Sequence, residues 1–240
     1  MAAKKSPSSS KFSWEPATDN HIALRQAILD KPIVFVNGPQ GSGKTFNSFM
    51  TALELLAITG KNGGVDKIIC IRPIVPAGDD LGALPGGVDE KIDPYYEAIF
   101  QTIRKSNHPD TQALLDGDRL ELLALQLCRG QTFDDALIIV DEGQNLTPEQ
   151  MEMVLGRLGP NSKMVICGDL NQKDFRKLDG FTHALRLFEN DCMFGHIELT
   201  IDDIQRHPLV KHIIVTYNRD RELATQEREM LAQSRKLRVA

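Results

Sequence analysis

The chain has 240 residues, a mass of 26.7 kDa and a formal net charge of −5, with 41% apolar and 25% charged residues. A chain of this length and composition buries a large core, which excludes the small scaffolds that need disulfides or metals to fold. The mildly acidic charge excludes a histone-like protein, so any contact with nucleic acid must come from a local basic patch.

The cysteines and the first residues indicate the compartment. The four cysteines are widely spaced and form no CxxC pair, which favours reduced thiols over a disulfide framework or a zinc module. Residues 1–15 are rich in Lys, Ser and Pro and predict a disordered leader. They lack the apolar stretch of a signal peptide, and no run in the chain has the length of a membrane span. We therefore expect a cytoplasmic protein without a membrane partner.

Apolar runs alternate with helical patterns along the rest of the chain. A helix is predicted from Thr18 to the residue before Lys31, and the first strand follows at 33–37. Further strands are expected at 67–71, 137–140 and 164–167, with weaker candidates at 120–127 and 196–199. Helices are expected at 45–58, 93–104, 148–158 and 181–188. This alternation is typical of an α/β fold with a mostly parallel sheet and helices on both faces.

Two segments fall outside this alternation. Residues 73–87 contain three prolines and four glycines, which predicts a long ordered loop. The segment from residue 207 to about 238 is helix-like, with Glu and Arg interleaved. We therefore expect one domain at 16–218 and a charged C-terminal helix or tail at 219–240.

A phosphate-binding motif stands between the first strand and the next helix. Its residues match GxxxxGK[ST] at every position, as Gly38, Pro39, Gln40, Gly41, Ser42, Gly43, Lys44 and Thr45. The glycines let the backbone curl around phosphate oxygens, and the helix that follows adds the positive end of its dipole. Lys44 is expected to reach the β and γ phosphates, while the hydroxyl of Thr45 holds Mg²⁺. The sequence thus predicts a P-loop that binds ATP with Mg²⁺.

Two acids follow the apolar run at 137–140. Asp141 is predicted to hold the metal with Thr45, on a strand adjacent to the first one. Glu142 comes next, where it can accept a proton from the water that attacks the γ phosphate. This general-base role would make the site hydrolytic.

A further polar group ends the run at 164–167. Gly168 and Asp169 are followed by Gln172, which is expected at the same edge of the sheet. An amide can both donate and accept, so Gln172 can bridge the γ phosphate and the attacking water. We expect it to sense whether the γ phosphate is present.

These motifs resemble the ATPase core of the PhoH-like (phosphate-starvation-inducible) family. The likeness spans about residues 37–210 and rests on GPQGSGKT, IRPIVPAGDDLGALPGGVDEKIDPY, RGQTFDDALIIVDEGQN, KMVICGDLNQ and QRHPLV. It implies a RecA-like ATPase related to superfamily 1 helicases, with Asp141 to Gln144 and Gly168 to Gln172 similar to their DExQ and GDxxQ elements. The resemblance also implies work on RNA or single-stranded DNA and a homo-oligomer, for which a hexameric ring is one form. His21 stands where the family commonly has a base-recognising Gln.

RecA-like cores commonly use an arginine to neutralise charge on the transferred phosphoryl group, often from a neighbouring subunit. Arg206 is the first candidate, and Arg72 and Arg129 also match positions in the family motifs. His207 receives no catalytic role, because a lone His before Pro is more often a packing or capping residue.

Three functions remain open from the sequence. The leading one is a Mg²⁺-dependent ATPase that remodels RNA or single-stranded DNA, although aromatic residues make up only 6% of the chain and form no basic-aromatic stripe. A small-molecule kinase is the enzymatic rival, but residues 78–87 lack the arginines expected of its lid. The third is a nucleotide-gated assembly switch with little turnover. A GTPase is disfavoured because Asn171 to Asp174 only superficially match its guanine-reading motif.

Overall fold

The computed structural model describes residues 12–57, 64–73, 88–170 and 179–237. Its centre is a six-stranded sheet in the order β3-β2-β4-β5-β1-β6, in which every neighbouring pair is parallel. The strands are β1 (Ile33–Asn37), β2 (Lys67–Arg72), β3 (Leu120–Ala124), β4 (Ala136–Val140), β5 (Lys163–Gly168) and β6 (Phe194–Glu198). The prediction of an α/β fold with a parallel sheet is confirmed.

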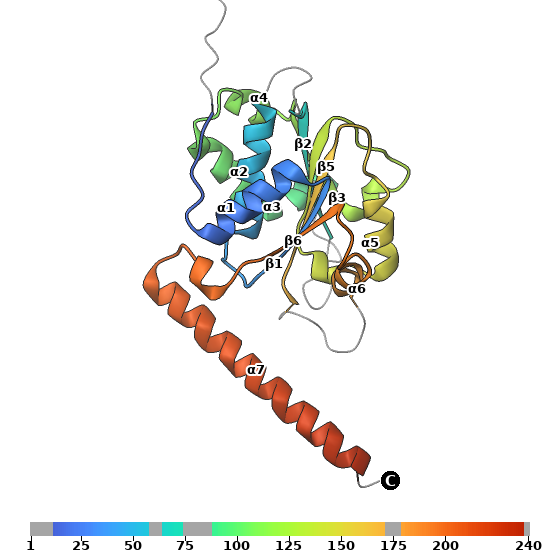
Figure 1. Ribbon diagram of the computed structural model, residues 1–240. Helices are drawn as coiled ribbons and strands as arrows, with labels where there is room; N and C mark the ends of the chain where they lie inside the picture. The colour runs from blue at the N-terminus through green and yellow to red at the C-terminus, as the bar shows by residue number, and fades with distance from the viewer. Residues whose placement is uncertain (1–11, 58–63, 74–87, 171–178, 238–240) are drawn as a thin grey trace, which may run out of the picture.

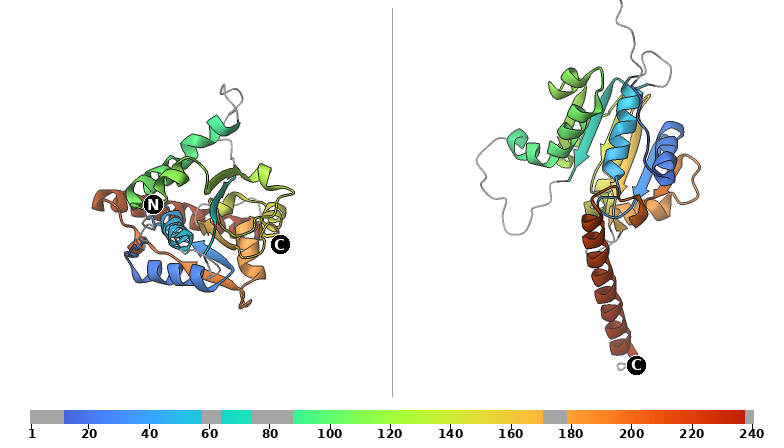
Figure 2. Two further views of the ribbon diagram at one scale, coloured as in Figure 1. Left: turned by 90° about the horizontal axis from the view of Figure 1, so that it is seen from above. Right: turned by 90° about the vertical axis from the view of Figure 1, so that its left-hand side faces the viewer.

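Helices cover both faces of the sheet (Figures 1 and 2). One face carries α1 (Asp19–Asp30), α2 (Lys44–Leu56), α3 (Val88–Ser106) and α4 (Thr111–Leu115), and the other carries α5 (Pro148–Leu155) and α6 (Gly180–Leu187). Alternate strand residues serve the two cores, since Val34 and Val36 pack in the first and Ile33 and Phe35 in the second. This double coverage explains why the strands read as continuous apolar runs.

Several helices and strands begin or end at other residues than the sequence predicts. The third helix begins at Val88 instead of residue 93, and the short helix α4 was not expected. The predicted strand at 120–127 ends at Ala124, because the chain turns there into a 3-10 helix, Leu125–Cys128. The predicted loop at 73–87 lies outside the described residues except for Pro73.

The order of the strands corrects one prediction. We expected the strand before Asp141 to be adjacent to β1, but β5 lies between β4 and β1. The apolar pattern identifies a strand without identifying its neighbours, so the order could not be derived from it. The carboxyl ends of β1, β5 and β4 nevertheless meet at one edge of the sheet.

The first described residues belong to the folded body. Phe12 and Trp14 pack against the core on the α1 face. The predicted leader of 1–15 therefore extends too far along the chain, because it includes these two packed residues. Thr18 then caps α1 by accepting from the backbone N–H of His21.

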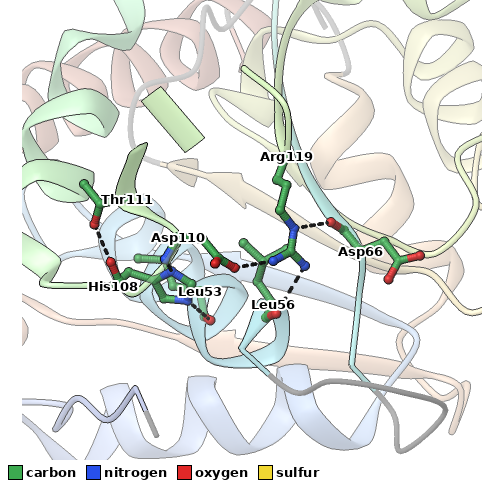
Figure 3. Close-up of polar contacts among 7 residues, drawn as sticks. All are labelled: Leu53, Leu56, Asp66, His108, Asp110, Thr111 and Arg119. Carbon is green, nitrogen blue, oxygen red and sulfur yellow. Dashed lines mark hydrogen bonds and ion pairs between the residues drawn. The ribbon is translucent and has the colours of Figure 1, made fainter. Parts of the chain in front are cut away.

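A polar cluster fixes the far end of this face (Figure 3). Arg119 donates to the carbonyl oxygens of Asp66 and Leu56 and pairs with the carboxylate of Asp110. Buried His108 accepts at Nδ1 from the backbone N–H of Asp110 and donates from Nε2 to Leu53 O. Burial lowers the pKa of His108, so its ring is neutral. The cluster therefore joins the end of α2 to the starts of α4 and β3.

The last helix, α7 (Pro208–Leu237), projects from the body (Figures 1 and 2). It continues through residue 218 without a break, so the expected boundary between 218 and 219 is not a boundary between elements. Within the described part of the chain, no helix is both long and apolar enough to cross a membrane.

Candidate nucleotide-binding site

The P-loop connects the end of β1 to the start of α2, as the motif requires. Its first residue is held to the neighbouring strand, because Gly38 N donates to Gly168 O at 3.2 Å. Gly41 and Gly43 have φ values of +82° and +89°, a left-handed conformation in which other residues are strained. These two glycines therefore allow the backbone to turn sharply and to enter the first turn of α2.

The cavity above the loop has a volume of about 590 Å³, a size suited to a nucleotide. Five of the predicted phosphate-binding residues line it, namely Gln40, Gly41, Gly43, Lys44 and Thr45. Gly38, Pro39 and Ser42 are buried in the wall behind them. The loop thus presents most of its residues to the cavity, while Gly38, Pro39 and Ser42 pack behind them.

Two side chains that have no place in the motif hold the loop from outside. Asn47 donates to Gly43 O at 2.7 Å, and His21 Nε2 is 2.8 Å from Ser42 O. Because a carbonyl oxygen only accepts, His21 carries its proton on Nε2. Lys44 Nζ donates to Gly38 O at 2.6 Å and to Pro39 O at 3.1 Å. The loop is therefore braced by α1 and by α2 itself.

The residues predicted to hold magnesium lie together. Thr45 Oγ1 donates to Asp141 Oδ1 at 2.9 Å, although the two residues are 96 positions apart in the chain. A hydroxyl and a carboxylate beside a phosphate loop are hard oxygen donors of the kind that Mg²⁺ prefers. The donor set at this end of the cavity fits a magnesium ion.

Glu142 is held by two donors. Its Oε1 accepts from Arg72 at 3.1 Å, and its Oε2 accepts from Gln144 Nε2 at 2.6 Å. Gln144 in turn accepts at Oε1 from the backbone N–H of Asp169 at 3.1 Å. Glu142 also has a φ of +55°, unusual for this residue type. These contacts fix the carboxylate at the cavity wall and link β2, β4 and β5.

The arginine candidates have different surroundings. Arg206 lines the cavity, and a Cβ added at Gly41 would be 3.4 Å from Arg206 Nε. It therefore reaches the phosphate loop of its own chain. Arg72 contacts Glu142, whereas Arg129 is exposed beyond β3 and is not part of the cavity wall. The predicted sensor Gln172 lies outside the described residues.

Further residues of the cavity wall lie outside the P-loop and the acidic motifs, and of these only His21 was singled out, by the family resemblance. They come from the segment before α1, from α1, from α2 and from the connection before α7: Trp14, Glu15, Ala17, His21, Phe46, Asp203 and Gln205. For the segment before α1, the signal in the sequence was the single tryptophan of the chain, but it stands in a stretch whose composition predicted disorder. Long-range packing, which composition does not report, brings this segment to the site.

Two titratable groups beside the cavity have altered pKa values. Burial raises the pKa of Cys167 to about 12, with a further contribution from Asp141, so this thiol stays neutral. Burial opposes ionisation of Asp203, but hydrogen bonds from Thr18, Thr200 and Asn20 outweigh it and lower the pKa of this carboxyl. Asp203 is therefore a charged anchor between α1 and the segment that carries Arg206.

Comparisons with known proteins point to one family. The family model for PhoH-like proteins matches residues 14–218. A PhoH-like protein from Bacillus subtilis is 42% identical over 196 residues, covering 80% of this chain and 60% of the relative. Protein PhoH from Escherichia coli K12 is 35% identical over 198 residues, covering 80% of this chain and 55% of the relative. The chain thus spans little more than half the length of these relatives.

A solved structure gives a weaker likeness. Pif1 helicase from Candida albicans has a TM-score of 0.37 and 13% identity, covering 76% of this chain and 39% of the helicase. That similarity is too low to bear on function. The parallel sheet with a phosphate loop between β1 and α2 makes the domain a RecA-like P-loop fold. By the family match and the identities over most of its length, the chain belongs to the PhoH-like protein family.

Proposed function

We propose that the chain is a Mg²⁺-dependent ATPase whose hydrolysis drives remodelling of RNA or single-stranded DNA in an oligomer. The observation that carries the hydrolytic part is the hydrogen bond of 2.9 Å between Thr45 and Asp141, next to Glu142. This arrangement supports a metal-bound triphosphate on the loop with a carboxylate beside it. The ATPase unit of the proposal is the sheet with its covering helices and the packed residues before α1, and α7 extends from it as one charged helix.

The residues divide the work of binding. Lys44 and the backbone N–H groups at the start of α2 hold the β and γ phosphates. Thr45 and Asp141 would hold Mg²⁺, which when bound neutralises charge on the phosphate oxygens. Arg206 adds positive charge beside Gly41 of the loop.

Hydrolysis then requires one proton transfer. The oxygen of a water attacks the γ phosphorus, the bond to the bridging oxygen of ADP breaks, and Glu142 accepts the proton of the water. Gln144 and Arg72 orient Glu142, since each donates to one of its carboxylate oxygens. Arg206 neutralises the charge that develops on the transferred phosphoryl group. In this proposal, Gln172 senses whether the γ phosphate is present.

The polymer and the oligomer rest on the family resemblance. A homo-oligomer places several nucleotide sites around one polymer, and α7 projects from the body, where it is available for contacts outside the domain (Figure 1). The cytoplasm is the compartment in which such a polymer and reduced cysteines occur together.

A second function is favoured by one observation. Both carboxylate oxygens of Glu142 accept hydrogen bonds from protein groups, so an attacking water has to compete with these two donors. Slow hydrolysis of this kind is what a nucleotide-gated assembly switch would need, because the bound ATP has to persist while subunits are in contact. Phosphate release by the purified chain, with and without RNA or single-stranded DNA, separates the two functions. Stimulation by a polymer supports the remodelling ATPase, and slow unstimulated release combined with ATP-dependent assembly supports the switch. Release that appears only with added metabolites would instead support a small-molecule kinase.

A further inference from the structure

The side chain of Arg206 is placed beside the phosphate loop without a polar contact of its own. It is exposed and lines the cavity, and a Cβ added at Gly41 would be 3.4 Å from its Nε. Among the residues that the structure describes, no hydrogen bond or ion pair holds its guanidinium there. The position of this charge therefore depends mainly on the backbone that carries it.

One carboxylate holds that backbone three residues before the arginine. Asp203 ends a short 3-10 helix and is 3% exposed. Its Oδ1 accepts from Thr18 Oγ1 at 2.5 Å, and its Oδ2 accepts from Asn20 Nδ2 at 2.9 Å. The same Oδ2 accepts from the backbone N–H of Thr200 at 2.6 Å and from its hydroxyl at 3.1 Å. Both oxygens of this buried carboxylate are thus paired with protein donors.

These contacts join two segments that are distant in the chain. Thr18 and Asn20, at the start of α1, are 185 and 183 positions away from Asp203. Figure 1 shows the segment before α7 passing beside the start of α1. Three residues of chain span at most about 11 Å, so fixing Asp203 against α1 limits how far Arg206 can move from the loop.

Resting on the proposed function, in which Arg206 neutralises charge on the transferred phosphoryl group, we propose that Asp203 is a positioning residue for hydrolysis. It holds the segment before α7 against α1, so that Arg206 is in place before the reaction begins. A charge placed in advance needs little reorganisation during the reaction. A misplacement of about 1 Å can slow a reaction by about 100-fold, so losing this support should lower turnover.

The test compares Asp203→Asn with Asp202→Asn. An amide has one oxygen instead of two, so donors that converge on Asp203 lose their acceptor. Asp202 is the adjacent acid, and its side chain is 97% exposed. We expect Asp203→Asn to lower turnover at saturating Mg·ATP by about 10- to 100-fold and to change ATP affinity by less than about threefold. Asp202→Asn should leave both turnover and affinity unchanged.

A double-mutant cycle separates positioning of Arg206 from a general structural role. Arg206→Ala alone should lower turnover by about 10³-fold or more. Because Asp203 acts through this arginine, adding Asp203→Asn to Arg206→Ala should lower turnover no further. A combined loss equal to the product of the two single losses overturns the inference, since Asp203 would then act independently of Arg206.

A measurement without nucleotide reports on the same segment. Trypsin cleaves after arginine, and mass spectrometry identifies the fragment that ends at Arg206. We expect this fragment to form at least about fivefold faster in Asp203→Asn than in the wild type or Asp202→Asn, because the segment opens locally more often. Thermal melting shows that the variants are folded at the temperature of the assay. An unchanged cleavage rate in folded Asp203→Asn overturns the inference.

Asn20→Ala provides a second variant in case Asp203→Asn does not fold, because it removes only one of the donors to Asp203. It should lower turnover by about threefold to tenfold in the wild-type background and not at all in Arg206→Ala. Wild-type turnover in Asn20→Ala overturns the inference.

The outcomes distinguish this inference from the proposed function. Wild-type protein that binds Mg·ATP without hydrolysing it, or Arg206→Ala with wild-type turnover, overturns the proposed role of Arg206 together with this inference. Wild-type turnover in folded Asp203→Asn, beside an impaired Arg206→Ala, overturns this inference alone.

Discussion

Replacing Glu142 by glutamine removes the proposed general base and keeps the size of the side chain. The carboxylate accepts from Arg72 at 3.1 Å and from Gln144 at 2.6 Å, and an amide has only one oxygen with which to accept. One of the two contacts is therefore lost. Because the side chains of Arg72 and Glu142 are 28% and 34% exposed, solvent screens the pair, and the loss of stability is about 1 kcal/mol or less.

The effect on turnover is much larger. A positioned general base contributes about 10²- to 10⁴-fold to a rate, so phosphate release from Glu142→Gln should fall by that factor. Binding of ATP should change by less than about threefold, because the groups expected to hold the phosphates are Lys44, Thr45 and the loop backbone. The assay is phosphate release at saturating Mg·ATP, with calorimetry for the affinity.

A matched control uses an acid far from the cavity. Glu152 is exposed on α5, and Glu152→Gln should leave both turnover and affinity unchanged. If Glu142→Gln binds ATP normally and also hydrolyses it at close to the wild-type rate, Glu142 is not the base and the proton goes to another group.

Four further predictions concern individual residues. Gly41→Ala places a side chain at φ +82° and 3.4 Å from Arg206, which should lower the melting temperature by about 2–8 °C; an unchanged melt would contradict the strain. Because Arg206 reaches its own phosphate loop, mixing Arg206→Ala with Lys44→Ala subunits should restore no turnover, and recovery would indicate an arginine acting between subunits. The pKa of His108 is lowered by burial, so the unfolded chain takes up this proton first as the pH falls below about 6.5, and the unfolding free energy should decrease there. Denaturant titrations at pH 7.5 and 5.5 test this, and an equal slope in His108→Gln would refute it. Arg119→Ala removes three hydrogen bonds and should cost about 1–3 kcal/mol in the same titration; a loss near zero would mean that water replaces them.

The fold was predictable from the sequence because its signals are local. Continuous apolar runs, which are typical of strands buried on both faces, identified the strands. The motif from Gly38 to Thr45 identified the turn between β1 and α2. The order of the strands was not predictable, since it depends on which runs pair in space. That is why the placement of β4 beside β1 was wrong, although Asp141 still reaches Thr45 across β5.

The site was predictable on its phosphate side only. A phosphate loop uses fixed residue types at fixed spacing, so Lys44, Thr45 and Asp141 could be named from the sequence. The rest of the cavity wall is built by packing between distant segments, and no local pattern predicts that Trp14 lines it or that His21 is hydrogen-bonded to the loop. The partners of Glu142 were missed for the same reason.

The central claim is that the loop from Gly38 to Thr45 binds the triphosphate of Mg·ATP. Calorimetric titration of the purified chain with Mg·ATP measures this directly, with Lys44→Ala as the comparison. We predict one site per chain and an affinity about 10- to 100-fold lower in Lys44→Ala, the loss of a charged hydrogen-bonding group. Folded wild-type protein that gives no binding heat, or a variant that titrates like the wild type, would contradict the account.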